Sequence, residues 1–299
     1  MSQAPTATAP PAADPPAGPA GPNAAMREFW DGEGGAKWVR MADDVEASLQ
    51  PFGRAAMAAL AIAPGNSLLD VGCGCGATTL DLADRAGPAG LALGVDIAET
   101  MLAEARRRAA RRPAVSFRRL DPQTDHLPPA TFDRVYSRFG IMFFDDPAAA
   151  MANLAQALRP GGRLAFVCWQ AAGLNPWMRA PQEVVARHLT MPERPDPDAP
   201  GPFAFADSGR LRSLLTAAGF TDITIDSLEQ PLVVAATVEQ AADSAMDMGP
   251  ANRLLLETGA APKVRQALLS DLRDFFSHHQ TAHGIALDAA TWVVAGRRP

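Results

Sequence analysis

Three features of this 299-residue sequence predict an α/β fold built on a mostly parallel sheet. Apolar, strand-like segments alternate with helical segments from about residue 68 onward, and the first strand runs into a glycine-rich turn. Several of the strands also end in an acidic residue. Strands that alternate with helices form parallel sheets with right-handed crossovers, and ligands bind where the strands end. The sequence therefore predicts a ligand site at the carboxyl edge of this sheet.

Composition limits the class of protein. With 47% hydrophobic and 20% charged residues, the chain can bury a full core and suits one domain with insertions. A net charge of −6 disfavours a nucleic-acid-binding surface, and no apolar run is long enough to span a bilayer. The three cysteines are an odd number, which favours a reducing compartment, and no second cysteine or histidine pair has zinc-binding spacing. We therefore expect a cytoplasmic protein without a metal site.

The first predicted strand and its turn have the sequence LLDVGCGCGATTL, which begins at Leu68. Glycines let the backbone adopt positive φ and approach a ligand closely, and the helix that follows offers free N–H groups. The turn satisfies the dinucleotide pattern G-x-G-x-x-G/A, and Asp96 has the spacing of a ribose-binding acid. Asp70, however, would repel a pyrophosphate, whereas it suits the sulfonium and ammonium of S-adenosylmethionine (SAM). We therefore expect SAM rather than a dinucleotide.

Four further strands are expected before residue 170, with helices between them. The strands cover residues 91–96, 115–121, 132–137 and 163–169. The first three of these end in Asp96, Asp121 and Ser137. A carboxylate at a strand end can accept charge-assisted hydrogen bonds from both hydroxyls of a ribose. The helices are predicted at residues 99–112 and 146–158, the second with an aspartate N-cap followed by proline.

From about residue 55 to residue 169, the sequence resembles the SAM-binding half of class I SAM-dependent methyltransferases, in the small-molecule, type 11-like branch. The motifs that carry the resemblance are the turn after Asp70 and the segment SRFGIMFFDDP, which begins at Ser137. The resemblance implies a Rossmann-like, seven-stranded methyltransferase sheet that is mostly parallel, with an antiparallel last strand and helical lid insertions. It also implies SAM as the methyl donor.

The same resemblance implies which residues bind the cofactor. The methionine part of SAM is expected beside Asp70, Gly72 and Gly74, the ribose at Asp96 and the adenine amino group at Asp121. The other cofactor-binding candidates are Trp30, Cys73, Ile97, Met101, Pro122, Gln123 and Ser137, with Ser137 beneath the sulfonium. In this family the residue after the adenine-binding acid commonly donates its backbone N–H to the ring, and here that residue is a proline without an N–H. Gln123 or Thr124 is expected to substitute.

The chain is expected to divide into four parts. They are a disordered Ala/Pro-rich tail (1–23), an N-terminal helical cap (24–53), a SAM-binding core (54–170), and a part that completes the fold (171–299). The cap contains Trp30 and Trp38, and either covers the cofactor as a lid or packs on the outside of the sheet. The last part contains the final antiparallel strands, at 221–234 and 291–295, and a mostly helical insertion at about 238–287. This insertion is expected to be a substrate lid or a homodimer surface.

The expected reaction transfers a methyl group to oxygen or nitrogen of a small apolar or aromatic metabolite of secondary metabolism, with release of S-adenosylhomocysteine. Orientation of the reactants alone can lower the activation barrier by roughly 7–11 kcal/mol. The reaction therefore does not require a particular catalytic residue, and none is assigned. The candidates for a general base are His126, His278, His279 and His283. The candidates around the acceptor are Phe139, Met142, Trp177 and Met246, with Arg253 as an anion anchor.

Two other functions fit the same motifs. SAM could undergo intramolecular cyclisation of its aminocarboxypropyl chain, which releases methylthioadenosine. Alternatively, the chain could be a non-catalytic regulator that binds SAM. The products formed from SAM distinguish the three functions.

Overall fold

The structure is a computed structural model that describes residues 21–299 apart from 193–195, 197 and 249–250. Its strands are β1 (Ser67–Val71), β2 (Leu91–Asp96), β3 (Val115–Arg119), β4 (Phe132–Arg138), β5 (Leu158–Trp169), β6 (Thr221–Ala235), β7 (Gln280–Thr281) and β8 (Gly284–Arg297). They form one sheet in the order β3-β2-β1-β4-β5-β8-β6, with the short β7 paired to β8. The first five strands pair in parallel, and β8 runs antiparallel to both β5 and β6. The predicted α/β fold is confirmed.

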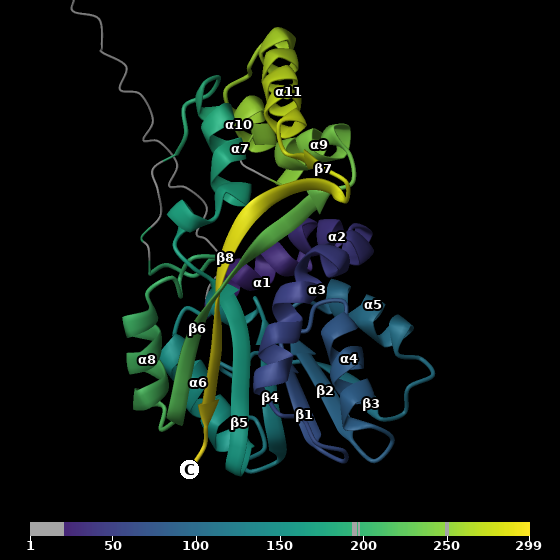
Figure 1. Cartoon of the computed structure of the whole chain (residues 1–299), viewed down its shortest axis with the longest axis vertical. Coiled ribbons are helices and arrows are strands. Elements are labelled where there is room, and N and C mark those ends of the chain that lie inside the picture. Colours follow the sequence, from purple (N-terminus) through teal and green to yellow (C-terminus); the bar gives the residue numbers. More distant parts are fainter. Residues whose placement is uncertain (1–20, 193–195, 197, 249–250) are drawn as a thin grey trace, which may run out of the picture.

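The helices are α1 (Ala24–Asp31), α2 (Glu33–Arg40), α3 (Ala42–Ala59), α4 (Ala77–Ala86), α5 (Glu99–Arg108), α6 (Pro147–Ala157), α7 (Pro176–Ala186), α8 (Ser208–Ala217), α9 (Val238–Met248), α10 (Ala251–Glu257) and α11 (Pro262–Ser277). In the view of Figure 1, α3, α4 and α5 lie on one side of the sheet, and α6 and α8 lie on the other. The purple α1 and α2 lie near the edge where the parallel strands end. They therefore stand where the ligand of such a sheet is bound.

Several boundaries differ from those predicted from the sequence. The helix predicted at 99–112 ends at Arg108, and residues 109–111 form a turn before Pro113. The last strand, predicted at 291–295, extends from Gly284 to Arg297. This strand pairs along both edges, with β5 and β6, and its residues 284–289 alternate between buried and less buried positions. The predicted end of the insertion, at residue 287, therefore lies inside β8.

The molecule has two large apolar cores. One lies at the sheet and includes side chains of α3, α6 and α8. The other is built by α7, α9, α10 and α11 with the first residues of β8. We call these four helices the helical unit, which stands above the sheet in Figure 1. Trp177 and Val234 pack against both cores and join them. Within the described part of the chain, no helix combines the length and apolar character needed to cross a bilayer.

Candidate cofactor and acceptor site

The glycine-rich turn after β1 is tied to the neighbouring strand and lies against the loop after β4. The backbone N–H groups of Gly72 and Cys73 donate to the Val95 carbonyl oxygen, at 2.9 and 3.1 Å. Gly72 has a φ of +68°, and a Cβ built on it would lie 2.7 Å from the Gly140 Cα. Gly72 is therefore needed both for its backbone conformation and for this close packing.

Gly74 differs from the other glycines of the turn. Its φ is +53°, and a Cβ there would lie 3.8 Å from Trp38 Nε1 and 3.9 Å from Met101 Sδ, the two nearest of its neighbours. By contrast, a Cβ on Gly76 would lie 2.7 Å from the Phe117 ring. Gly74 thus has room on its open side, toward α2 and α5, where a ligand can approach the backbone.

Asp70 presents a buried carboxylate oxygen beside this turn. The side chain is 1% exposed, and its Oδ2 accepts from the hydroxyls of Thr78 and Thr79 at 2.7 and 2.6 Å. Among the described residues no group donates to Oδ1. Burial raises the pKa of Asp70 to about 6, against the two hydroxyl hydrogen bonds that lower it. A buried carboxylate with an unused oxygen suits a cationic ligand, and this acceptor fits the ammonium of SAM.

Asp96 connects the end of β2 to the turn. Its Oδ2 accepts from the Gly74 N–H and its Oδ1 from the Ala98 N–H, both at 2.9 Å. Burial raises the pKa of this carboxyl, while these backbone hydrogen bonds oppose the shift. Each carboxylate oxygen can accept a second hydrogen bond, so two ribose hydroxyls can be added without loss of the first pair.

Asp121 is linked to helix α1. Its Oδ2 accepts from Asn23 Nδ2 at 2.8 Å and from Arg27 Nη2 at 3.4 Å, and its Oδ1 accepts from the Gln123 N–H at 3.0 Å. The Gln123 side-chain oxygen accepts from the Asp146 N–H at 2.9 Å. Pro122 is buried, and its carbonyl oxygen accepts from an asparagine side chain. The loop after β3 is therefore held from several sides.

The other cofactor candidates lie around the same edge. Trp30 makes edge-on contacts with Trp38 and Phe143, with ring centroids 5.5 and 5.7 Å apart, and it packs with the buried Met101. The Asp31 carboxylate accepts from the Glu99 N–H at 2.6 Å. These contacts hold α1 and α2 beside the turn rather than on the outside of the sheet.

Ser137, Ile97 and Cys73 have structural contacts at this edge. The buried Ser137 hydroxyl donates to the Val71 carbonyl oxygen at 2.7 Å, and the Ile97 carbonyl oxygen accepts from Arg119 Nε at 3.1 Å. Burial raises the pKa of the Cys73 thiol, which keeps it neutral. Within the described residues, no group of three histidine, cysteine, aspartate or glutamate side chains could hold a metal ion.

Of the acceptor candidates, the structure brings Phe139 and Trp177 together. Phe139 has a φ of +58° and stacks on Trp169, with ring centroids 4.1 Å apart and an interplanar angle of 10°. Trp169 in turn lies 4.7 Å from Trp177 and 5.7 Å from Phe52. We call these four rings the aromatic cluster. Trp169 and Phe52 were missed from the sequence, although the position of Trp169 at the end of β5 was a usable signal.

The remaining acceptor candidates lie elsewhere. Met142 is buried in the sheet core, and its carbonyl oxygen accepts from the Gly201 N–H. Met246 is 2% exposed and belongs to the core of the helical unit. The Arg253 side chain is 64% exposed and lies 3.8 Å from Glu257 on the same helix. The structure does not place Met246 and Arg253 with the aromatic cluster.

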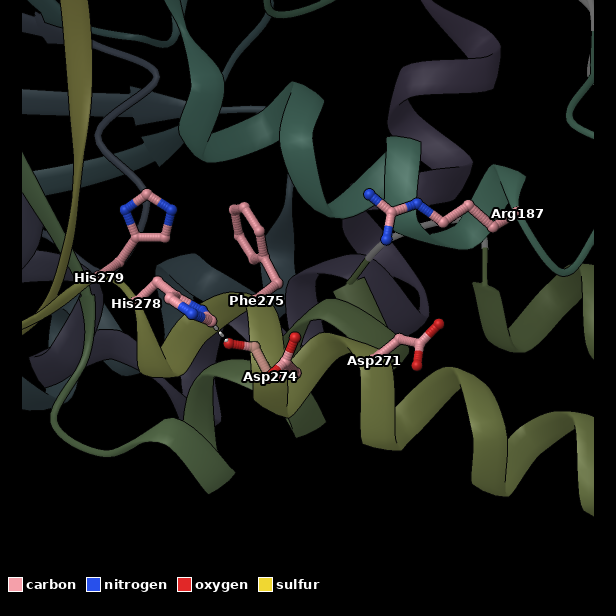
Figure 2. Close-up of a pocket in the computed structure, with 6 residues that line it drawn as sticks. All are labelled: Arg187, Asp271, Asp274, Phe275, His278 and His279. Atoms are coloured by element: carbon pink, nitrogen blue, oxygen red, sulfur yellow. Dashed lines mark hydrogen bonds between the residues drawn. The ribbon is translucent and has the colours of Figure 1, made fainter.

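The four histidine candidates lie on the surface or in the helical unit. His278 and His279 line a cavity of about 280 Å³, together with Arg187, Asp271, Asp274 and Phe275. Figure 2 shows these side chains along α11, with Arg187 opposite them at the end of α7. His126 and His283 are exposed. This polar cavity belongs to the helical unit and not to the glycine-rich turn.

Comparison with known proteins agrees with this geometry. Residues 68–162 match the family model described as "Methyltransferase domain". The chain is 35% identical over 170 residues to the nocamycin O-methyltransferase of Saccharothrix syringae, which covers 54% of this chain and 61% of that protein. It is 36% identical over 118 residues to the aklanonic acid methyltransferase DauC of Streptomyces sp. strain C5, covering 39% of this chain and 54% of that protein. The chain thus matches little more than half the length of these relatives.

Among solved structures, the fold is similar to that of phosphoethanolamine N-methyltransferase 2 of Haemonchus contortus in complex with SAM. The TM-score is 0.55 at 15% identity, and the match covers 92% of this chain and 60% of that chain. The fold, the glycine-rich turn and these matches together define a class I SAM-dependent methyltransferase domain, and SAM is the cofactor of this class. Within this chain, the match to the methyltransferase domain covers residues 68–162.

Proposed function

We propose that this chain transfers the methyl group of SAM to an oxygen or nitrogen of a small aromatic or apolar metabolite of secondary metabolism. The observation that carries the proposal is the aromatic cluster, which combines the ends of β4 and β5 with α7. The loop after β4 also lies directly against the turn at Gly72, so this cluster adjoins the cofactor edge. Two relatives named as methyltransferases of nocamycin and aklanonic acid support an organic acceptor.

In this proposal SAM supplies an electrophilic methyl group, and the protein orients the reactants. Asp70 meets the ammonium with its unused Oδ1, and Asp96 accepts from the ribose hydroxyls. Phe52, Phe139 and Trp169 are buried, so the partly buried Trp177 is the ring of the aromatic cluster that would contact and align an acceptor. Phe139 is held in a left-handed conformation by its N–H, which donates to the Val167 carbonyl oxygen at 3.0 Å. Strain of this kind is typical of functional positions.

The helical unit is proposed to cover the acceptor. Its core meets the sheet core at Trp177, and the Lys37 ammonium of α2 donates to the Asp247 carbonyl oxygen of α9 at 2.8 Å. The N-terminal cap and the helical unit therefore touch above the carboxyl edge of the sheet. The alternative is that the helical unit is a surface for association of two copies of the chain. Size-exclusion chromatography distinguishes the two roles.

The test is incubation with methyl-labelled SAM and a panel of small metabolites that begins with aklanonic acid, followed by mass spectrometry. Equal amounts of labelled product and S-adenosylhomocysteine support methyl transfer. Release of methylthioadenosine would instead show cyclisation of SAM, and binding without turnover would show a regulator. In the active case, Trp177→Leu should lower kcat/KM for the acceptor about tenfold while SAM affinity changes less than about threefold.

A further inference from the structure

The side chain of Asn23 bridges two elements at the end of the cofactor edge that carries Asp121. Its Nδ2 donates to Asp121 Oδ2 at 2.8 Å, and its Oδ1 accepts from the Asp145 N–H at 2.8 Å. Both Asn23 and Asp121 are 2% exposed. The Asn23 backbone N–H also donates to the Asp145 carboxylate at 2.5 Å. One carboxamide thus satisfies an acceptor from the loop after β3 and a donor from the loop before α6.

A carboxamide presents a donor and an acceptor side by side on one edge. Adenine has the same pair on its six-membered ring, where the exocyclic amino group is the donor and N1 is the adjacent acceptor. A site that receives the Asn23 carboxamide through Asp121 and the Asp145 N–H therefore has the hydrogen-bonding complement of an adenine edge. The residue after Asp121 is Pro122, which cannot donate a backbone hydrogen bond to such a ring.

We propose that the adenine of SAM binds in place of the Asn23 carboxamide, with its amino group on Asp121 and its N1 accepting from the Asp145 N–H. The Asp145 backbone then supplies the donor that Pro122 lacks. Asn23 and the adenine would contact the same two partners, so the two compete and Asn23 must withdraw before the adenine binds. This assignment rests on SAM as the cofactor but not on the identity of the acceptor.

The first experiment measures the affinity of S-adenosylhomocysteine by calorimetry for the wild type, Asn23→Ala and Asp31→Ala. The Asn23→Ala variant should bind at least threefold more tightly, because a competitor is removed. Asp31→Ala is the control, since it detaches the other end of α1 from Glu99 without contact to Asp121. A loss of affinity in Asn23→Ala would overturn the proposal that Asn23 competes with adenine. An equal gain of affinity in both variants would also overturn it, because loosening of α1 alone would then explain the gain.

The second experiment uses a 1-deaza analogue of S-adenosylhomocysteine, in which a C–H replaces N1 and the amino group is kept. The wild type should bind it about tenfold more weakly than the parent compound, because the Asp145 N–H loses its acceptor. Asp145→Ala keeps this N–H and should show the same penalty. Equal affinities for the two compounds would overturn the assignment of Asp145. By contrast, a wild type that binds neither compound would overturn SAM as the cofactor.

Discussion

At the scale of single residues, the three acids at the strand ends differ in how the protein satisfies them. Asp96 and Asp121 accept hydrogen bonds on both oxygens, whereas Asp70 has an unused oxygen inside the protein. Burial raises the pKa of both Asp70 and Asp96, but of these two only Asp70 has a carboxylate oxygen without a hydrogen bond. The protein thus accepts a cost at the position where a cationic ligand group would compensate it.

The contribution of Asp70 to the stability of the ligand-free protein should therefore fall as the pH rises through the range from 4 to 6. The folded state holds a proton on Asp70 up to about pH 6, whereas the unfolded state releases it near 3.8, so stability is lost in that window. The difference corresponds to about 3 kcal/mol as an upper limit. Asp70→Asn should remove this slope and raise the free energy of unfolding at pH 7, as measured by urea denaturation. Parallel pH profiles for both proteins would contradict the prediction.

Asp96→Ala should weaken SAM binding at least tenfold, because hydrogen bonds to a charged group contribute about 1.5–3 kcal/mol each. Calorimetry measures the change, and a thermal melt checks the loss of the links to Gly74 and Ala98. Asp96→Asn is the control, since it preserves size and one acceptor and should lose less affinity. Equal affinity for SAM in the wild type and Asp96→Ala would reject the assignment of the ribose. NADH should not bind measurably to any of these proteins.

Residue identities predicted the motif but not the role of each member. The sequence shows three glycines in the turn, and only the structure distinguishes Gly72, packed against Gly140, from the open Gly74. Asn23 was assigned to the tail because its neighbours are alanine, proline and glycine, yet it is buried against Asp121. Trp169 was assigned to a strand without a functional role. Contacts between residues that are distant in sequence decided all three cases.

At the scale of elements, the strands that end in an acid were predictable from the sequence. Each is an apolar run followed by an acidic residue, and both features are local in the sequence. The full length of β8 and the early end of α5 were not predictable, since the first depends on pairing with β6 and β7 and the second on the turn at residues 109–111. The position of α1 and α2 was likewise open from sequence. Asn23 and Asp31, at the two ends of α1, contact Asp121 and Glu99. These partners lie 98 and 68 residues further along the chain, and no local pattern encodes such contacts.

Two deletions test the function of the N-terminal cap. Removal of residues 1–22 should leave stability and SAM affinity unchanged, because that composition cannot bury a core. Removal of residues 1–40 also removes Asn23, so this protein is compared with Asn23→Ala. It should bind SAM more weakly than that variant, because Trp30 and Trp38 no longer pack over Met101 beside the turn. The shorter deletion is the matched control for the longer one. If the protein without residues 1–40 binds SAM as tightly as Asn23→Ala, α1 and α2 do not form part of the cofactor site.

At the scale of the whole molecule, the cofactor edge and the helical unit are packed around different cores. Asp70 and Asp96 belong to β1 and β2 of the sheet, whereas Met246 lies in the second core. The two cores share few side chains, among them Trp177. A change confined to the second core should therefore affect the acceptor more than SAM, if the helical unit covers the acceptor.

Met246→Ala and Arg253→Ala separate packing from charge in that unit. Met246→Ala leaves a cavity in the second core and should cost about 2–5 kcal/mol of local stability, with reduced methyl transfer and SAM affinity within about threefold. Arg253→Ala should leave stability and methyl transfer unchanged, because the Arg253 side chain is exposed and lies 3.8 Å from Glu257. Loss of methyl transfer in Arg253→Ala would instead make it an anchor for an anionic acceptor. A shift in apparent mass of Met246→Ala on size-exclusion chromatography, with acceptor kinetics unchanged, would show that the helical unit is an association surface.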